Sequence, residues 1–138
     1  MISAASCALV ADSSPYISAL VRDVLVGLRV RRVLEARDGA EALTLLTERK
    51  PALVVLDWDL TIVGARDILA TVRDGGEAPA IAVTMREPTR SAVEAALGFG
   101  VGTILSMPLS TRELRMRLAR LATIPGGGAH PESIEIAA

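Results

Sequence analysis

The feature that most constrains the fold is an apolar run, Leu53-Val54-Val55-Leu56, that ends in an aspartate, Asp57. A run of β-forming residues without polar interruption is typical of a central strand in a parallel sheet, covered by helices on both faces. Ligands of such open sheets bind at the carboxyl ends of the strands. The sequence therefore places the Asp57 carboxylate on a rigid element at the edge of a crevice.

A second apolar run, residues 8–11, ends in the same way with Asp12. Strand-like runs alternate with helical patterns along the whole chain, and the runs cover residues 8–11, 33–36, 53–56, 80–84 and 103–106. The intervening segments have helical apolar spacing, and the capping residues that open helices are Ser14 before Pro15, Asp38 with Glu41, Thr89, and Ser110 with Glu113. A weaker helix is expected over residues 65–73.

This alternation predicts an α/β fold with a doubly wound, five-stranded parallel sheet and right-handed crossovers. We expect the flavodoxin-like strand order 2-1-3-4-5 in a three-layer sandwich. In that order the first and third strands are neighbours, so Asp12 and Asp57 meet at one sheet edge. Residues 1–124 are expected to form one domain, and residues 125–138 a flexible Gly/Pro-rich tail or linker remnant.

Composition excludes several classes of function. The 138 residues are 51% hydrophobic, which is enough for one domain with a substantial core. A formal net charge of −1 leaves no basic surface for direct nucleic-acid binding, and three aromatic residues are too few for stacking on bases or a flavin. There is no signal-peptide pattern and no apolar run of membrane-spanning length. The single cysteine, Cys7, excludes a disulfide within one chain, and a reducing cytoplasm is the expected location.

The polar strand ends suggest a particular chemistry. Clustered carboxylates can hold a hard cation such as Mg²⁺, which takes few protein oxygens and keeps several waters. An aspartate beside such an ion can accept a phosphoryl group. Thr84, at the end of the fourth strand, is placed to hold one phosphoryl oxygen.

With these features together, residues 6–123 resemble the receiver domain of two-component response regulators, the CheY-like domains. The resemblance rests on the acidic turn at Asp12, on Asp57-Trp58, on Thr84 and on Met107-Pro108. It implies that Asp57 is the phosphoacceptor, that Thr84 is the switch residue, and that the bond before Pro108 is cis. A histidine kinase, a phosphotransfer protein or another signalling protein would be the partner.

The resemblance also implies a docking and dimer surface formed by the fourth helix, the fifth strand and the fifth helix. On that last helix, Arg112, Arg115 and Met116 are the candidate contact residues, and a homodimer through this surface is possible. The simpler interpretation of the arginines is a solvated helix face. Met116 lies off the leucine stripe, which suggests an exposed apolar contact.

Three positions depart from the family pattern. Ser13 stands where the second acid of the acidic turn would bind the metal, so Mg²⁺ binding should be weak or absent. Met107 replaces the lysine that pairs with the phosphoryl group; losing one such donor costs about 3 kcal/mol, or about two orders of magnitude in rate. Ile104 replaces the aromatic switch on the fifth strand. The structural alternatives are a helix-capping Ser13 and packing roles for Met107 and Ile104.

Two residues could compensate for these losses. Asp59 could add a second acid to the metal site from a new direction. Arg86, two residues past Thr84, could bring a positive charge to the phosphoryl site, whereas the chain's only lysine, Lys50, precedes the third strand at the opposite end of the sheet. A solvated loop arginine is the competing interpretation of Arg86.

We therefore expect a stand-alone receiver domain that is not an enzyme and that acts by protein binding. It would be either a slow phosphoacceptor at Asp57 or a pseudo-receiver that works without phosphorylation. The alternative is a flavodoxin-like cofactor binder or a phosphatase of the aspartyl-phosphate type, for which Asp57 and Asp59 have suitable spacing. For a cofactor binder, the chain lacks a glycine in the loop after Asp12. For a phosphatase of this type, it lacks a downstream lysine and further acids.

Overall fold

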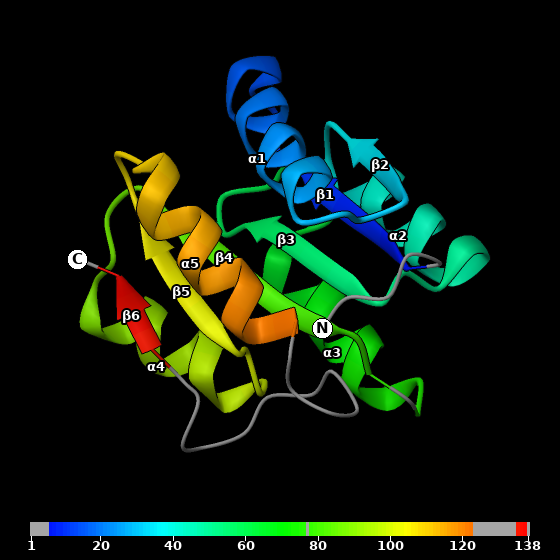
Figure 1. Cartoon of the computed structure of the whole chain (residues 1–138). Coiled ribbons are helices and arrows are strands. Elements are labelled where there is room, and N and C mark those ends of the chain that lie inside the picture. Colours follow the sequence, from blue (N-terminus) through cyan, green and yellow to red (C-terminus); the bar gives the residue numbers. More distant parts are fainter. Residues whose placement is uncertain (1–5, 77, 123–134, 138) are drawn as a thin grey trace.

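The computed structural model describes residues 6–76, 78–122 and 135–137. Six strands and five helices follow one another along this part of the chain (Figure 1). Their bounds are β1 Cys7–Ala11, α1 Pro15–Gly27, β2 Arg32–Ala36, α2 Gly39–Arg49, β3 Leu53–Asp57, α3 Ala65–Asp74, β4 Ala80–Met85, α4 Arg90–Gly98, β5 Thr103–Ser106, α5 Thr111–Ala122 and β6 Glu135–Ala137.

The helices begin where the capping pattern predicts. The Ser14 side chain accepts a hydrogen bond from the Ile17 N–H at 3.2 Å, and Pro15 is the first residue of α1. Asp38 caps α2 by accepting from the Glu41 N–H at 2.9 Å, and Thr89 caps α4 in the same manner. These side chains satisfy backbone donors that have no partner within the helix, so each crossover leaves its strand at a defined residue.

The sheet has the predicted order for its first five strands. Its full order is β2-β1-β3-β4-β5-β6, and every neighbouring pair is parallel (Figure 1). The sixth strand was not expected: Glu135–Ala137, from the segment predicted as a flexible tail, pairs with β5. The other residues of the predicted tail, 125–134 and 138, lie outside the described residues.

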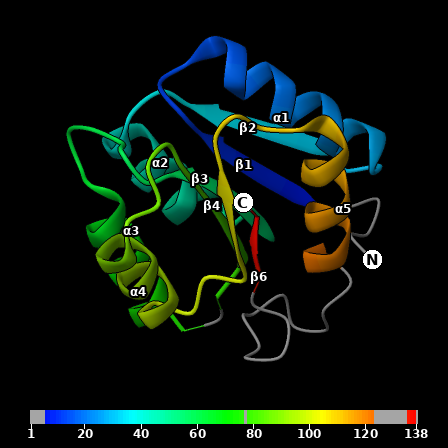
Figure 2. The same cartoon turned by 90° about the vertical axis from the view of Figure 1, so that its left-hand side faces the viewer.

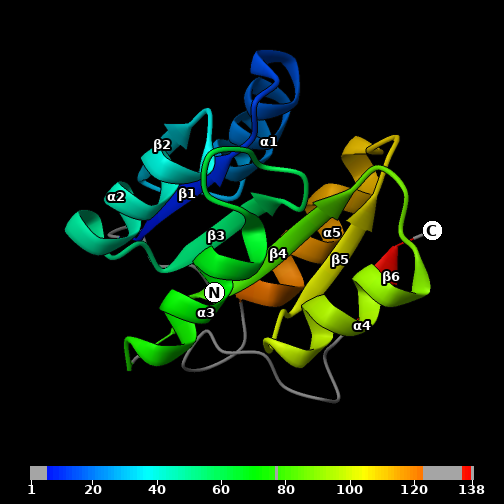
Figure 3. The ribbon, with the colours of Figure 1, turned by 180° about the vertical axis from the view of Figure 1, so that it is seen from behind.

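Helices cover both faces of the sheet. Figures 2 and 3 show α1 and α5 on one face and α2, α3 and α4 on the other. Alternate strand residues enter the two resulting cores, because successive side chains of a strand point to opposite faces. Val10 and Val55 pack towards α1 and α5, whereas Leu9, Val54 and Ile104 pack towards the other three helices.

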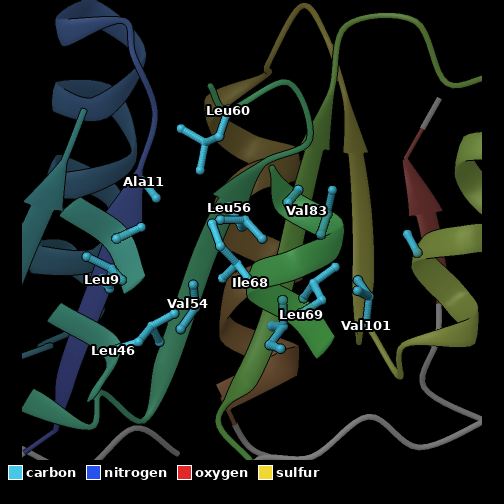
Figure 4. Packing of buried hydrophobic residues seen from close by; sticks show 14 of the residues in the cluster. Leu9, Ala11, Leu46, Val54, Leu56, Leu60, Ile68, Leu69, Val83 and Val101 are labelled. Carbon is cyan, nitrogen blue, oxygen red and sulfur yellow. The ribbon is translucent and has the colours of Figure 1, made fainter. Parts of the chain in front are cut away.

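Complete burial explains the unbroken apolar runs. All five residues of β3 and all six of β4 are buried. Figure 4 shows the larger core, where Leu56 and Val83 from the sheet meet Ile68 and Leu69 from α3. A central strand with both faces covered has no position that favours a polar side chain until it reaches the sheet edge.

Gly39, the first residue of α2, holds the loop between β3 and α3. Its N–H donates to the Thr61 carbonyl at 2.8 Å, and a Cβ at Gly39 would lie 1.7 Å from the Val63 carbonyl oxygen. The two backbones approach so closely that only glycine fits. This contact fixes the loop that follows Asp57.

We predict that Gly39→Ala lowers the free energy of unfolding by about 1–3 kcal/mol, because the clash is with backbone that cannot rotate away. Gly98→Ala is the control, since nothing lies within 4 Å of a Cβ at Gly98, which ends helix α4. The control should be neutral or more stable by up to about 1 kcal/mol. Denaturant unfolding measures both variants; equal stability would show that the Gly39 contact is not close in solution.

Candidate functional site

Three polar strand ends meet at one edge of the sheet. Asp57 is paired with Thr84 in the β3–β4 register, and the β1–β3 register pairs Ala11 with Leu56, which brings Asp12 beside Asp57. Strand alternation points all three polar side chains to the face covered by α1 and α5. They are almost fully buried, with exposed fractions of 4% for Asp12, 4% for Asp57 and 1% for Thr84.

Local backbone holds the two aspartates in place. Asp12 Oδ1 accepts a hydrogen bond from the Ser14 N–H at 2.8 Å, and Asp57 Oδ1 accepts from the Asp59 N–H at 3.0 Å. Each bond fixes one carboxylate oxygen against the turn that follows its strand. Both aspartates are therefore presented by rigid backbone and not by a flexible loop.

The hydroxyl of Thr84 has no hydrogen-bond partner among the described residues, although it is fully buried. Leaving a buried hydroxyl unpaired costs about 1–3 kcal/mol, so such groups usually have a partner. A hydroxyl of this kind, in register with a buried aspartate, can donate to an oxygen of a ligand bound at Asp57.

The electrostatics favour a cationic or hydrogen-bonding ligand. Burial raises the pKa of Asp57, the Asp59 N–H opposes this, and the negative charges of Asp12 and Asp59 raise the pKa further. Burial likewise raises the pKa of Asp12, while the Ser14 N–H and the arginines Arg86 and Arg37 oppose it. Two buried carboxylates thus repel each other, with partial compensation from nearby positive charge.

The donor set for a metal is small. Ser13 and Asp59 are exposed, and Ser14, not Ser13, caps α1. Within the described part of the chain, no group of three or more His, Cys, Asp or Glu side chains could hold a metal ion. The buried carboxylates of Asp12 and Asp57 are a pair of hard oxygen donors, which suits a weakly held divalent cation that keeps most of its waters.

The other family positions lie as follows. Ile104 is fully buried in the core beneath α2, α3 and α4. Met107 is partly buried; its N–H donates to the Met85 carbonyl at 2.9 Å, and its bond to Pro108 is cis, as the resemblance implies. Lys50 is the C-cap that follows α2, and it lines a cavity of about 660 Å³ between α2 and α3, at the far end of the sheet from Asp57.

The candidate contact residues on α5, Arg112, Arg115 and Met116, are all exposed. Arg112 is exposed and Met116 is 44% exposed, on the side away from the core. Arg115 is also exposed, and its guanidinium extends towards α1, where it lies 3.8 Å from the position of a Cβ at Gly27.

Two residues near the site were missed by the sequence reasoning. Arg37 donates to the Asp12 carbonyl at 3.4 Å and pairs with Glu35 at 3.2 Å. Ile62, in the loop after β3, is 79% exposed and has a φ of 71°, which is strained for a β-branched residue. The position of Arg37 directly after a strand was an available signal, whereas nothing in the local sequence marks Ile62.

Comparisons with known proteins agree on one family. A family model described as the response regulator receiver domain matches residues 8–119. A chemotaxis protein CheY homolog of Campylobacter jejuni is 31% identical over 126 residues, which cover 88% of this chain and 96% of that relative. The transcriptional regulatory protein KdpE of Mycobacterium tuberculosis is 32% identical over 112 residues, covering 80% of this chain; the chain spans only 48% of KdpE.

Solved structures of other proteins have the same fold as this chain. The chemotaxis response regulator CheY4 of Vibrio cholerae matches with a TM-score of 0.76 at 20% identity, covering 85% of this chain and 98% of that chain. Among the residues that the structure describes, no helix is long and apolar enough to cross a membrane.

We predict that Asp57→Asn stabilises the metal-free protein at pH 7. Burial raises the pKa of Asp57, so ionisation of its carboxyl is less favourable in the folded than in the unfolded chain. The amide keeps the oxygen that accepts from Asp59 and removes the charge. A gain of about 1 kcal/mol, the usual scale for a buried polar group, raises Tm by about 2–5 °C in a domain of this size.

The sign also predicts a pH dependence. The ionised Asp57 carboxyl destabilises the wild-type fold fully above its folded-state pKa, and this destabilisation fades as the pH falls through that pKa. The stability gained by Asp57→Asn should therefore shrink in acid. Thermal unfolding in a chelating buffer at several pH values measures this. Asp23→Asn, at an exposed position of α1, should change Tm little; a lower Tm for Asp57→Asn at pH 7 would contradict the prediction.

Proposed function

The chain belongs to the family of response regulator receiver domains, the modules of two-component signalling, and from this premise we propose that Asp57 is a slow phosphoacceptor. The phosphoryl donor would be a histidine kinase or a phosphotransfer protein. The domain would then act by binding another protein, since receiver domains are generally signalling modules and not enzymes.

The observation that carries the proposal is the unpaired hydroxyl of Thr84. It is buried, in register with Asp57, and has no partner in the described part of the chain. A purely structural threonine at a strand end would find a backbone or side-chain partner. A phosphoryl oxygen on Asp57 would supply the missing acceptor, which supports a phosphoryl site that has kept its hydroxyl.

The reaction follows from the chemistry of a carboxylate. An oxygen of Asp57 attacks the phosphorus of the donor, an O–P bond forms, and the bond from phosphorus to the donor nitrogen or oxygen breaks. The leaving group keeps the electron pair of that bond, and a leaving imidazole also takes a proton. Asp57 is left as an acyl phosphate, and the Thr84 hydroxyl donates to one of its phosphoryl oxygens.

A divalent cation fits this site weakly. Asp12 and Asp57 would hold it, with exposed Asp59 as a further acid, and Ser13 offers only a neutral hydroxyl. When bound, such an ion neutralises charge on the phosphoryl oxygens. We infer that Mg²⁺ affinity is lower than it would be with an acid in place of Ser13.

The docking side of the protein is proposed to be the surface formed by α4, β5 and α5, with β6 along the outer edge of β5. A second copy of the chain or another signalling protein would bind there. Exposed Met116 and Arg112 support this assignment. Ile104 cannot swing between two states as an aromatic ring does, because it is β-branched and fully buried. Any change on phosphorylation would therefore pass through the β4–α4 loop that follows Thr84.

We predict that incubation with an acyl phosphate and Mg²⁺ adds the mass of one phosphoryl group to the wild-type chain and none to Asp57→Asn. Met107→Lys should accelerate the uptake by about 100-fold, because it restores one preorganised positive donor in the transition state. Intact-mass measurement over time gives the rates.

The control variant is Ala52→Lys, which adds the same charge at an exposed position at the opposite end of β3. It should leave the rate unchanged. Uptake in neither the wild type nor Met107→Lys would contradict the proposal and support a pseudo-receiver that works without phosphorylation. Uptake that persists in Asp57→Asn would show that a different residue is modified.

A further inference from the structure

The site described above carries more negative than positive charge. Asp12 and Asp57 are buried side by side, and Asp59 contributes a third negative charge that acts on Asp57. Met107 is neutral, and Lys50 lies at the other end of the sheet. A phosphoryl group would add further negative charge, so a cation from elsewhere in the chain would favour its binding beside a weakly held divalent ion.

The path of β4 brings Arg86 to this edge. Thr84 is in register with Asp57, and the hydrogen bond from the Met107 N–H to the Met85 carbonyl shows that β4 and β5 remain paired up to Met85. Arg86 follows directly, two residues after Thr84, in the bend that leaves the strand at this edge of the sheet. Its side chain is exposed and starts from the rim of the site.

The electrostatics agree with this placement. The positive charge of Arg86 lowers the pKa of both Asp12 and Asp57, and among the described residues it is the one cation that acts on Asp57. Arg37 acts on Asp12 only. Arg86 is therefore close enough to both carboxylates to influence their ionisation.

Arg86 is also available for a ligand. Arg37 is already bound to Glu35 at 3.2 Å and to the Asp12 carbonyl at 3.4 Å. Arg90, the next arginine along the chain, pairs with Glu94 at 3.4 Å. No hydrogen bond or ion pair is found for Arg86 within the part of the chain that the structure describes.

We propose that Arg86 is the phosphoryl-binding cation of this domain and takes over the role that Met107 cannot perform. The inference rests on the proposed function of Asp57. The guanidinium would donate to phosphoryl oxygens from the β4–α4 side while the Thr84 hydroxyl donates to another oxygen. Its planar fork suits two phosphoryl oxygens at once, and it stays charged at every physiological pH.

This role has a consequence for signalling. Arg86 lies in the loop that joins β4 to α4, so a bond from Arg86 to the phosphoryl group would draw that loop towards Asp57. The β4–α4 loop borders the proposed docking surface. Phosphorylation would therefore be communicated to α4 by an ion pair, without the aromatic side chain that Ile104 replaces.

Phosphoryl uptake from an acyl phosphate tests the proposal. Arg86→Ala should slow uptake by about 10- to 100-fold, Arg86→Lys should keep part of the rate, and Met107→Lys in the Arg86→Ala background should restore it. Arg90→Ala, which removes an exposed arginine of the same segment, should have no effect. Unchanged uptake in Arg86→Ala, or an equal loss in Arg90→Ala, would overturn the inference while leaving Asp57 as the phosphoacceptor.

A binding measurement separates this inference from the proposed function. Beryllium fluoride mimics a phosphoryl group on a carboxylate, and Trp58, the only tryptophan, adjoins Asp57 and reports binding by its fluorescence. Arg86→Ala should weaken binding by about 10-fold or more, and Arg90→Ala should not. Arg86-dependent binding without any phosphoryl uptake would refute the proposed function alone; no binding by the wild type would refute both.

Discussion

The site depends on the register of β3 between β1 and β4. This register pairs Ala11 with Leu56 and Asp57 with Thr84, and it brings the carboxyl ends of three parallel strands to one edge. A slip of one residue would turn Asp57 to the opposite face of the sheet, into the apolar core under α2, α3 and α4. Moving the Asp57 carboxylate into that apolar core would be costly, so the polar end of β3 helps to specify the register of the buried strand.

The polar groups of the site lower the stability of the folded chain. Two carboxylates are buried together, burial raises the pKa of each, and a buried hydroxyl has no partner in the described structure. Backbone N–H groups and Arg86 offset only part of this cost. Groups that cost stability are commonly found at functional sites, where stability and activity are in compromise.

The fold could be predicted closely because its signals are local. Apolar runs marked the strands, and Ser14, Asp38 and Thr89 marked helix starts, since capping acts within one turn. The sixth strand could not be predicted in this way. Glu135–Ala137 is only three residues long and is held by pairing with β5, so its structure depends on an edge built from distant sequence.

The candidate site was predictable in identity but not in environment. The sequence alone determined which side chains end the strands, that Ser13 stands in place of a second acid after Asp12, and that Met107 stands in place of a lysine. Only the tertiary structure decided that the Thr84 hydroxyl is unpaired, that Arg115 reaches α1, and that the charge of Arg86 acts on Asp57 while Lys50 lies at the far end. The physical reason is range: strand and helix preferences act between near neighbours along the chain, whereas burial and charge at the site arise between residues that only the packed crossovers bring together.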